Sequence, residues 1–210
     1  MNIQFSENRF FLSNIQLAMD HDYETILHEL FCETWIPQGN HQYTGQENPA
    51  FNYRWLIQNQ NPKSKILVSI IDYLQSTTVH NLALESLYSY NPQFEGLWGM
   101  DLNKMKRFAD WHAYFQKDCP GWYLKPHTDY RRLIATGMIY LTEKDDPNLS
   151  TYFYWDNKQE NEVRLSTNFG DGWLHVNDSP NIHVGMNKSD SDRYSILIGL
   201  TIKHPDDYRT

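Results

Sequence analysis

A histidine and an aspartate stand two residues apart near the middle of the chain, in the segment Gly-Trp-Tyr-Leu-Lys-Pro-His-Thr-Asp that ends at Asp129. In an extended chain, residues two apart point to the same side. The imidazole of His127 and the carboxylate of Asp129 can therefore bind one metal ion. A third ligand must come from elsewhere, and His183, in the later segment Asn-Ile-His-Val-Gly, is the best candidate.

An arginine and a serine open the last apolar run of the chain. Arg193 and Ser195 directly precede Ile-Leu-Ile-Gly-Leu-Thr-Ile, which is typical of a buried strand. Because they are two residues apart, their side chains share one face of that strand. A guanidinium can pair bidentately with a carboxylate, and a buried anion needs such a partner.

The order of these residues resembles that of a known enzyme family. Two histidines and one carboxylate on one face of a metal form the facial triad of non-haem Fe(II) oxygenases. With the distal histidine and the arginine ten residues after it, residues 121–202 resemble the 2-oxoglutarate- and Fe(II)-dependent oxygenases, in their prolyl-hydroxylase-like branch. The resemblance assigns His127, Asp129 and His183 as iron ligands.

The same resemblance assigns the residues that hold 2-oxoglutarate (2OG). Arg193 takes the position that pairs with the distal carboxylate of 2OG, and Ser195 completes an Arg-x-Ser pattern used for that carboxylate in parts of the superfamily. Tyr140 matches a tyrosine that hydrogen-bonds the cosubstrate in some members. One departure is local: Ser150-Thr151 stands where the family often has Gly-Thr.

These assignments imply an activity. The resemblance implies Fe(II), 2OG and O2, with hydroxylation of an amino-acid, peptidyl or other small-molecule substrate and release of succinate and CO2. Related halogenases lack the carboxylate ligand, so the presence of Asp129 favours hydroxylation, or another oxidation without chlorination. Arg131 and Arg132, directly after it, are candidates for contact with a substrate anion or with solvent.

Three alternatives stay open. His175, in Trp-Leu-His-Val, is a rival third ligand, although its alternation with apolar residues is more typical of a packed sheet residue. The second alternative is a cupin-type metal enzyme, which would not need Arg193 and Ser195. The third is a non-catalytic jelly-roll binding module, in which the histidines and the aspartate are structural. A hydrolase has little support, because no Gly-x-Ser-x-Gly motif occurs.

Composition limits the class of protein. The 210 residues suit one domain, and the 40% hydrophobic content can build a core. The net charge of −8 argues against binding duplex nucleic acid, which needs clustered Lys and Arg. No run approaches the ~20 apolar residues of a membrane span, and no signal peptide is expected. Two cysteines, Cys32 and Cys119, form no disulfide framework, so a cytoplasmic protein is expected. Oligomeric state is not readable.

The hydrophobic pattern predicts helices first and strands later. A helix is expected over 23–35 with Asp22 as its N-cap, a loop over 38–61, and a second helix from Asn61-Pro62. Residues 77–90 fit neither period, and 108–115 suit a strand or a short helix. Strands are expected over 133–142, 151–155, 163–167, 173–176, 182–184 and 193–203.

Taken with the resemblance, these elements predict a mainly β fold with flanking helices, built on a double-stranded β-helix (jelly roll). We expect a single oxygenase domain over 1–210. Within it, residues 1–95 form a mostly helical N-terminal support and residues 96–205 form the jelly-roll core.

Overall fold

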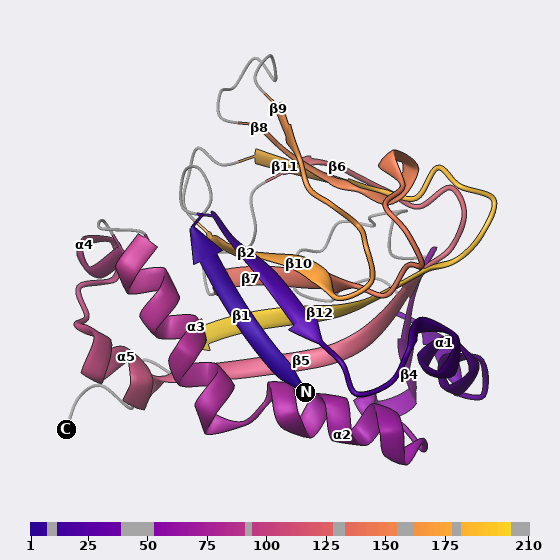
Figure 1. Ribbon diagram of the computed structural model, residues 1–210. Helices are drawn as coiled ribbons and strands as arrows, with labels where there is room; N and C mark the ends of the chain where they lie inside the picture. Colours follow the sequence, from indigo (N-terminus) through magenta and orange to yellow (C-terminus); the bar gives the residue numbers. More distant parts are fainter. Residues whose placement is uncertain are drawn as a thin grey trace.

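Two antiparallel sheets face each other in the computed structural model, which describes residues 1–7, 12–38, 53–90, 94–127, 133–154, 162–177 and 182–202 (Figure 1). The large sheet has the strand order β1 (Asn2–Glu7), β2 (Leu12–Ala18), β10 (Asp171–Val176), β7 (Leu133–Tyr140), β12 (Arg193–Ile202), β5 (Ala109–Asp118), β4 (Arg54–Ile57) and β3 (Trp35–Pro37). The small sheet has the order β6 (Tyr123–His127), β11 (Ile182–Met186), β8 (Thr151–Tyr154) and β9 (Glu162–Arg164).

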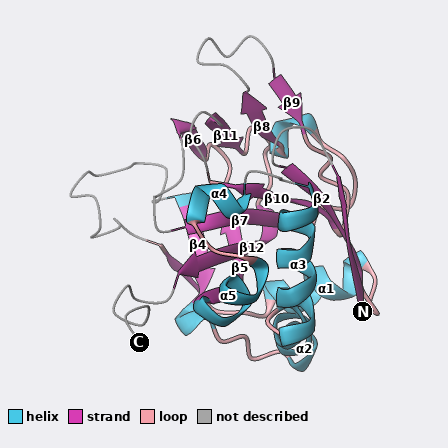
Figure 2. Cartoon of the chain, turned by 90° about the vertical axis from the view of Figure 1, so that its left-hand side faces the viewer, coloured by secondary structure: helices cyan, strands magenta, loops and turns pink. Residues whose placement is uncertain are grey.

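Helices cover the outer face of the large sheet. They are α1 (Tyr23–Phe31), α2 (Lys65–Leu74), α3 (Thr77–Tyr90), α4 (Phe94–Trp98) and α5 (Leu102–Phe108), with short 3-10 turns η2 (Gln58–Gln60) and η3 (Pro147–Leu149). Figure 2 shows α2 and α3 together on one side of this sheet, away from the small sheet. The structure therefore has three layers, and the two sheets enclose an interior that the helices do not enter.

Alternate side chains of β12 pack into two different layers of the core. Ile196, Ile198 and Leu200 are fully buried in the cluster that joins the large sheet to the helices. Leu197, on the other side of the strand, packs with the cluster between the two sheets. Because successive side chains of a strand point to opposite faces, a strand buried on both faces reads as a continuous apolar run.

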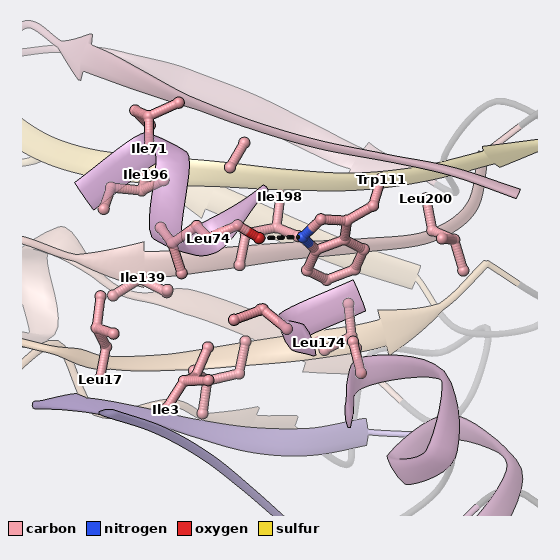
Figure 3. Close-up of a cluster of buried hydrophobic side chains, with 14 of the residues drawn as sticks. Ile3, Leu17, Ile71, Leu74, Trp111, Ile139, Leu174, Ile196, Ile198 and Leu200 are labelled. Carbon is pink, nitrogen blue, oxygen red and sulfur yellow. Dashed lines mark hydrogen bonds between the residues drawn. The ribbon is translucent and has the colours of Figure 1, made fainter. Parts of the chain in front are cut away.

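Hydrogen bonds as well as packing join the helices to the large sheet. The indole Nε1 of Trp111, on β5, donates to the carbonyl oxygen of Leu74 at the end of α2, at 2.8 Å. Figure 3 shows this bond among Ile71, Ile196 and Ile198. The bond gives the last turn of α2 a partner for one of its free carbonyls and fixes that helix on the sheet.

The N-terminal caps of α1 and α2 can be compared with the caps expected from the sequence. Asp22 caps α1 as predicted, because its Oδ1 accepts from the Thr25 amide at 2.8 Å. The helix ends at Phe31, and the segment from Trp35 forms β3 instead of a last helical turn. The predicted start of the second helix at Asn61-Pro62 was wrong. Ser64 caps α2, and the carboxylate of Glu33 accepts from the Lys63 and Ser64 amides.

The structure decides the segments that the sequence pattern left open. Residues 77–90 form the single helix α3, and of the two alternatives for 108–115 the strand is present, as part of β5, which begins at Ala109. The predicted loop over 38–61 contains β4, although residues 39–52 lie outside the described part. The strands predicted from 133 onward are present with shifted ends.

The predicted fold class is confirmed. The order of β5, β12, β7 and β10 opposite β6, β11, β8 and β9 is a double-stranded β-helix with flanking helices. The N-terminal part supplies helices α1–α3 and also extends the large sheet by β1–β4. Among the described residues, no helix is long and apolar enough to span a membrane.

The layer of helices generates a test of the fold. Leu84 on α3 is fully buried in the core, whereas Leu82 on the same helix is 41% exposed. Leu84→Ala should lower the free energy of unfolding by about 2–5 kcal/mol, because it leaves a cavity. Leu82→Ala should change it by only roughly 0.5 kcal/mol. Urea denaturation of both variants measures the two changes in the free energy of unfolding. Equal changes would contradict the packing of α3 described here.

Candidate metal and cosubstrate site

Two of the predicted metal ligands lie side by side on the small sheet. His127 ends β6 and His183 lies on β11, and the two residues are direct cross-strand partners. Their ring centroids are 4.3 Å apart. The tertiary structure thus brings together two imidazoles that are far apart in sequence, at a separation that suits ligands of one ion.

The hydrogen bonding of His127 fixes which ring nitrogen can bind a metal. Its Nδ1 lies 2.8 Å from the carbonyl oxygen of Lys125. A carbonyl only accepts, so Nδ1 carries the proton and Nε2 keeps its lone pair. Ligating histidines commonly have this support, because it sets the tautomer and the ring orientation. The hydrogen bond at Nδ1 therefore suits His127 as a metal ligand through Nε2.

The third predicted ligand, Asp129, lies outside the described residues, as do Arg131 and Arg132. Within the described ranges, no group of three or more His, Cys, Asp or Glu side chains could hold a metal. Completion of the triad by Asp129 accordingly stays a prediction.

The rival histidine lies deeper between the sheets. His175, on β10, is 1% exposed, and its ring centroid is 5.9 Å from that of His183. The ring of Phe153 contacts both, at 4.9 Å from His175 and 5.3 Å from His183. Because Phe153 packs on both rings, this contact does not distinguish the two histidines, and the strand pairing does. His183, in contrast, has His127 as its cross-strand neighbour.

Arg193 is fully buried and held by four hydrogen bonds. Its Nε and Nη2 donate to Oδ2 of Asp118 at 3.2 and 2.5 Å. Its Nη1 donates to the carbonyl oxygens of Leu149 and Met186 at 2.6 and 3.2 Å. A guanidinium has five N–H donors, so one N–H of Nη2 is left beyond these four bonds. The bonds fix the direction in which it points.

A second arginine shares the same carboxylate. Arg54, on β4, donates to Asp118 through Nε at 2.6 Å and through Nη2 at 3.1 Å. Burial by itself raises the pKa of Asp118, but the positive charges of Arg54 and Arg193 outweigh burial and lower the pKa below its usual range. Asp118 is therefore ionised at neutral pH, and the group of two arginines and one aspartate carries one net positive charge.

The indole ring of Trp122 contacts both of these cations. The Arg54 guanidinium carbon is 4.3 Å from the centroid of the indole ring, and that of Arg193 is 4.7 Å from it. Cation–π attraction partly offsets the cost of burying the charges. A Cβ at Gly185 would lie 2.4 Å from the indole, so glycine is required there for the ring to take this place.

A row of polar side chains crosses the inner face of the large sheet beside Arg193. Ser195 is the cross-strand partner of Gln116 on one side and of Tyr140 on the other, so all three share a face. Gln116 Nε2 donates to Ser195 Oγ at 3.0 Å, which leaves the serine proton available to another acceptor. All three residues are fully buried.

The hydroxyl of Tyr140 is already engaged by protein groups. It donates to Oγ1 of Thr151 at 2.9 Å and accepts from the Thr151 amide at 3.1 Å and from Trp173 Nε1 at 3.3 Å. One donor and two acceptor positions are the full capacity of a hydroxyl. A hydrogen bond from Tyr140 to a cosubstrate would thus replace one of these bonds.

Sequence reasoning missed four residues of this site, namely Arg54, Gln116, Asp118 and Trp122. Gln116 and Asp118 carry a weak signal, because they occupy polar positions in the otherwise alternating apolar strand β5. Arg54 carries none, since it lies in a segment predicted to be a loop.

Comparison with solved structures identifies the class of fold. A viral collagen prolyl hydroxylase from Paramecium Bursaria Chlorella virus-1, in its 2OG complex, aligns with a TM-score of 0.51 and 13% identity over 93% of this chain and 98% of that chain. A Pseudomonas putida prolyl-4-hydroxylase aligns with a TM-score of 0.48 and 13% identity over 87% of this chain and 100% of that chain. A Trichoplax adhaerens prolyl hydroxylase was solved in complex with a hypoxia inducible factor peptide fragment. It aligns with a TM-score of 0.38 and 17% identity, and the aligned part covers 45% of this chain and 44% of that chain.

At these identities the likeness establishes the fold. The chain has the double-stranded β-helix of the prolyl-hydroxylase-like 2OG- and Fe(II)-dependent oxygenases, which confirms the resemblance at the level of architecture. No protein-family model matches the sequence, and no curated protein matches it. The chemistry must therefore be argued from the residues of this site.

The histidine arrangement generates a test of the metal ligands. His183→Ala should weaken Fe(II) binding by more than about a hundredfold, since even the loss of an outer-shell partner costs 10–100-fold. His175→Ala should leave metal affinity within roughly threefold, because His175 lies on the large sheet, where its cross-strand partners are Leu12 and Thr136 instead of His127. Anaerobic equilibrium dialysis measures both, with circular dichroism as the control for folding. The reverse result would make His175 the third ligand.

Proposed function

We propose that the protein is a 2OG- and Fe(II)-dependent dioxygenase that hydroxylates an amino-acid, peptidyl or other small-molecule substrate. The observation that carries the proposal is the pairing of His127 with His183 on the small sheet of a double-stranded β-helix. The opposite sheet places Arg193, Ser195 and Tyr140 on its inner face. Imidazoles suit iron, and a buried cation suits a carboxylate.

Each residue has a stated task in this proposal. His127 and His183 bind the metal through ring nitrogens, and Asp129 supplies the carboxylate of the triad. Arg193 directs its fifth N–H, and Ser195 its hydroxyl proton, toward the distal carboxylate of 2OG. When bound, Fe(II) with 2OG and O2 supplies the oxidation of a substrate C–H bond to an alcohol, with 2OG converted to succinate and CO2.

The surroundings of the site support this chemistry. Phe153, Trp173 and Met138 form an apolar cluster between the sheets, which excludes water from the groups that hold the cosubstrate. Exclusion of water strengthens the attraction between a guanidinium and a carboxylate. The prolyl-hydroxylase-like resemblance favours a peptidyl or amino-acid substrate.

We further propose that residues 1–210 act as a single domain in a reducing compartment such as the cytoplasm. The N-terminal strands β1–β4 are hydrogen-bonded into the same sheet as the barrel strands. Both cysteines, Cys32 and Cys119, are free thiols, as is usual for proteins of reducing compartments.

The decisive experiment adds Fe(II) and then 2OG to the protein without oxygen and records the visible spectrum. We expect a weak charge-transfer band that requires both additions and that Asp129→Ala abolishes, because the triad then loses its carboxylate. Iron without 2OG is the control. Metal binding without a band would favour a cupin-type enzyme, and absence of metal binding would favour a binding module. A band that persists in Asp129→Ala would remove Asp129 from the triad.

A second experiment addresses Arg193. Arg193→Lys should weaken 2OG binding by roughly tenfold to a hundredfold while sparing iron, because an ammonium cannot replace the fixed fork of donors. Titration calorimetry of the Fe(II)-loaded protein without oxygen measures this affinity. Arg164→Lys is the matched control, since Arg164 forms an ion pair with Asp145 at the surface. Unchanged 2OG affinity in a folded Arg193→Lys variant would remove Arg193 from the cosubstrate site.

A further inference from the structure

The buried ion group of Arg54, Asp118 and Arg193 is larger than a carboxylate-binding arginine requires. Asp118 and Arg193 are fully buried, and Arg54 is 7% exposed. Within the described part of the chain, the ion pairs of both arginines end on Asp118. Without Arg54, the carboxylate of Asp118 would neutralise Arg193. With Arg54 present, one positive charge is in excess in the interior.

We propose that Arg54 is a positioning residue for anion binding: by sharing Asp118, it preserves the positive charge that the interior offers to the distal carboxylate of the cosubstrate. This inference rests on the proposed function and extends it to a residue that does not itself contact the cosubstrate. Asp118 correspondingly has two tasks, since it aims the Arg193 guanidinium and links it to Arg54.

The hydrogen bonds show that the two arginines share the one carboxylate of Asp118 and do not form two separate ion pairs. Arg54 donates to Oδ1 of Asp118 through Nε at 2.6 Å and to Oδ2 through Nη2 at 3.1 Å, and Arg193 donates to the same Oδ2 through Nε and Nη2. The indole of Trp122 contacts both guanidinium groups. A buried net charge is costly unless an anion or dipoles compensate it. An anion that enters beside Arg193 would supply the missing negative charge.

Two ligands that differ only in the distal group isolate this effect. 2OG carries a carboxylate there, and 2-oxopentanoate carries a methyl group on the same carbon skeleton. The ratio of their affinities, measured by titration into the Fe(II)-loaded protein without oxygen, reports the attraction for the distal charge. A role of Arg54 in folding alone would not change this ratio.

Arg54→Met should reduce the preference for 2OG over 2-oxopentanoate by about tenfold or more, because the ion group then carries no net charge. Lys117→Met is the matched control. It removes a positive charge from the neighbouring position of β5, but the Lys117 ammonium pairs with Asp192 at 3.4 Å and lies against Trp35 and Trp55. The preference should remain within roughly twofold in this control, because a partly exposed charge is screened.

The double variant Arg54→Met/Asp118→Asn decides between charge and structure. It leaves Arg193 as the charged member, so the net charge returns to the original value. The preference for 2OG should then recover to within roughly threefold of the unmodified protein, even if Arg54→Met alone does not fold. A preference as low as in Arg54→Met, or lower, would overturn the inference.

The outcomes separate this inference from the proposed function. If the unmodified protein binds neither ligand, the proposed function fails. If it binds and prefers 2OG while folded Arg54→Met retains the full preference, only the role of Arg54 fails. Thermal unfolding of each variant, with and without 2OG, shows whether the affinities refer to folded protein.

Discussion

The buried carboxylate of Asp118 joins parts of the molecule that are far apart in the sequence. Its two oxygens accept hydrogen bonds from Arg54 on β4 and Arg193 on β12, so it ties an N-terminal strand and the last strand to β5. Such a group is stable in the interior only while every charge keeps its partners, because an uncompensated buried charge is strongly destabilising. Here the hydrogen bonds among the three side chains and the carbonyl oxygens of Leu149 and Met186 supply those partners.

The interior of the barrel can hold these charges because the large sheet keeps its two faces separate. Apolar side chains of β5, β7, β10 and β12 pack on the helices and supply the main core. The inner face is thereby free to carry polar groups such as Gln116, Ser195 and His175, together with the small apolar cluster around Phe153 and Trp173. Stability and chemistry thus depend on opposite faces of the same strands.

Sequence reasoning succeeded where the signal is local. The apolar runs from residue 133 onward predicted strands with small errors at the ends, and Asp22 was recognised as a cap from its position before an amphipathic segment. It failed at Asn61-Pro62, because Ser64 caps α2 and the amides before the helix are bound by the distant carboxylate of Glu33. It gave no assignment over 77–90, where the apolar residues form no single stripe in the sequence.

The sequence by itself determined the types of residue available for chemistry, with His127 and Asp129 two apart and Arg193 ten residues after His183. The fold class followed from the strand pattern taken together with the family resemblance that these residues carry. Only the tertiary structure decided that His183 is the cross-strand partner of His127 and that Arg54 shares Asp118 with Arg193. The reason is physical: strand periodicity fixes which face a side chain occupies, but the pairing of strands far apart in the chain depends on the packing of the whole domain.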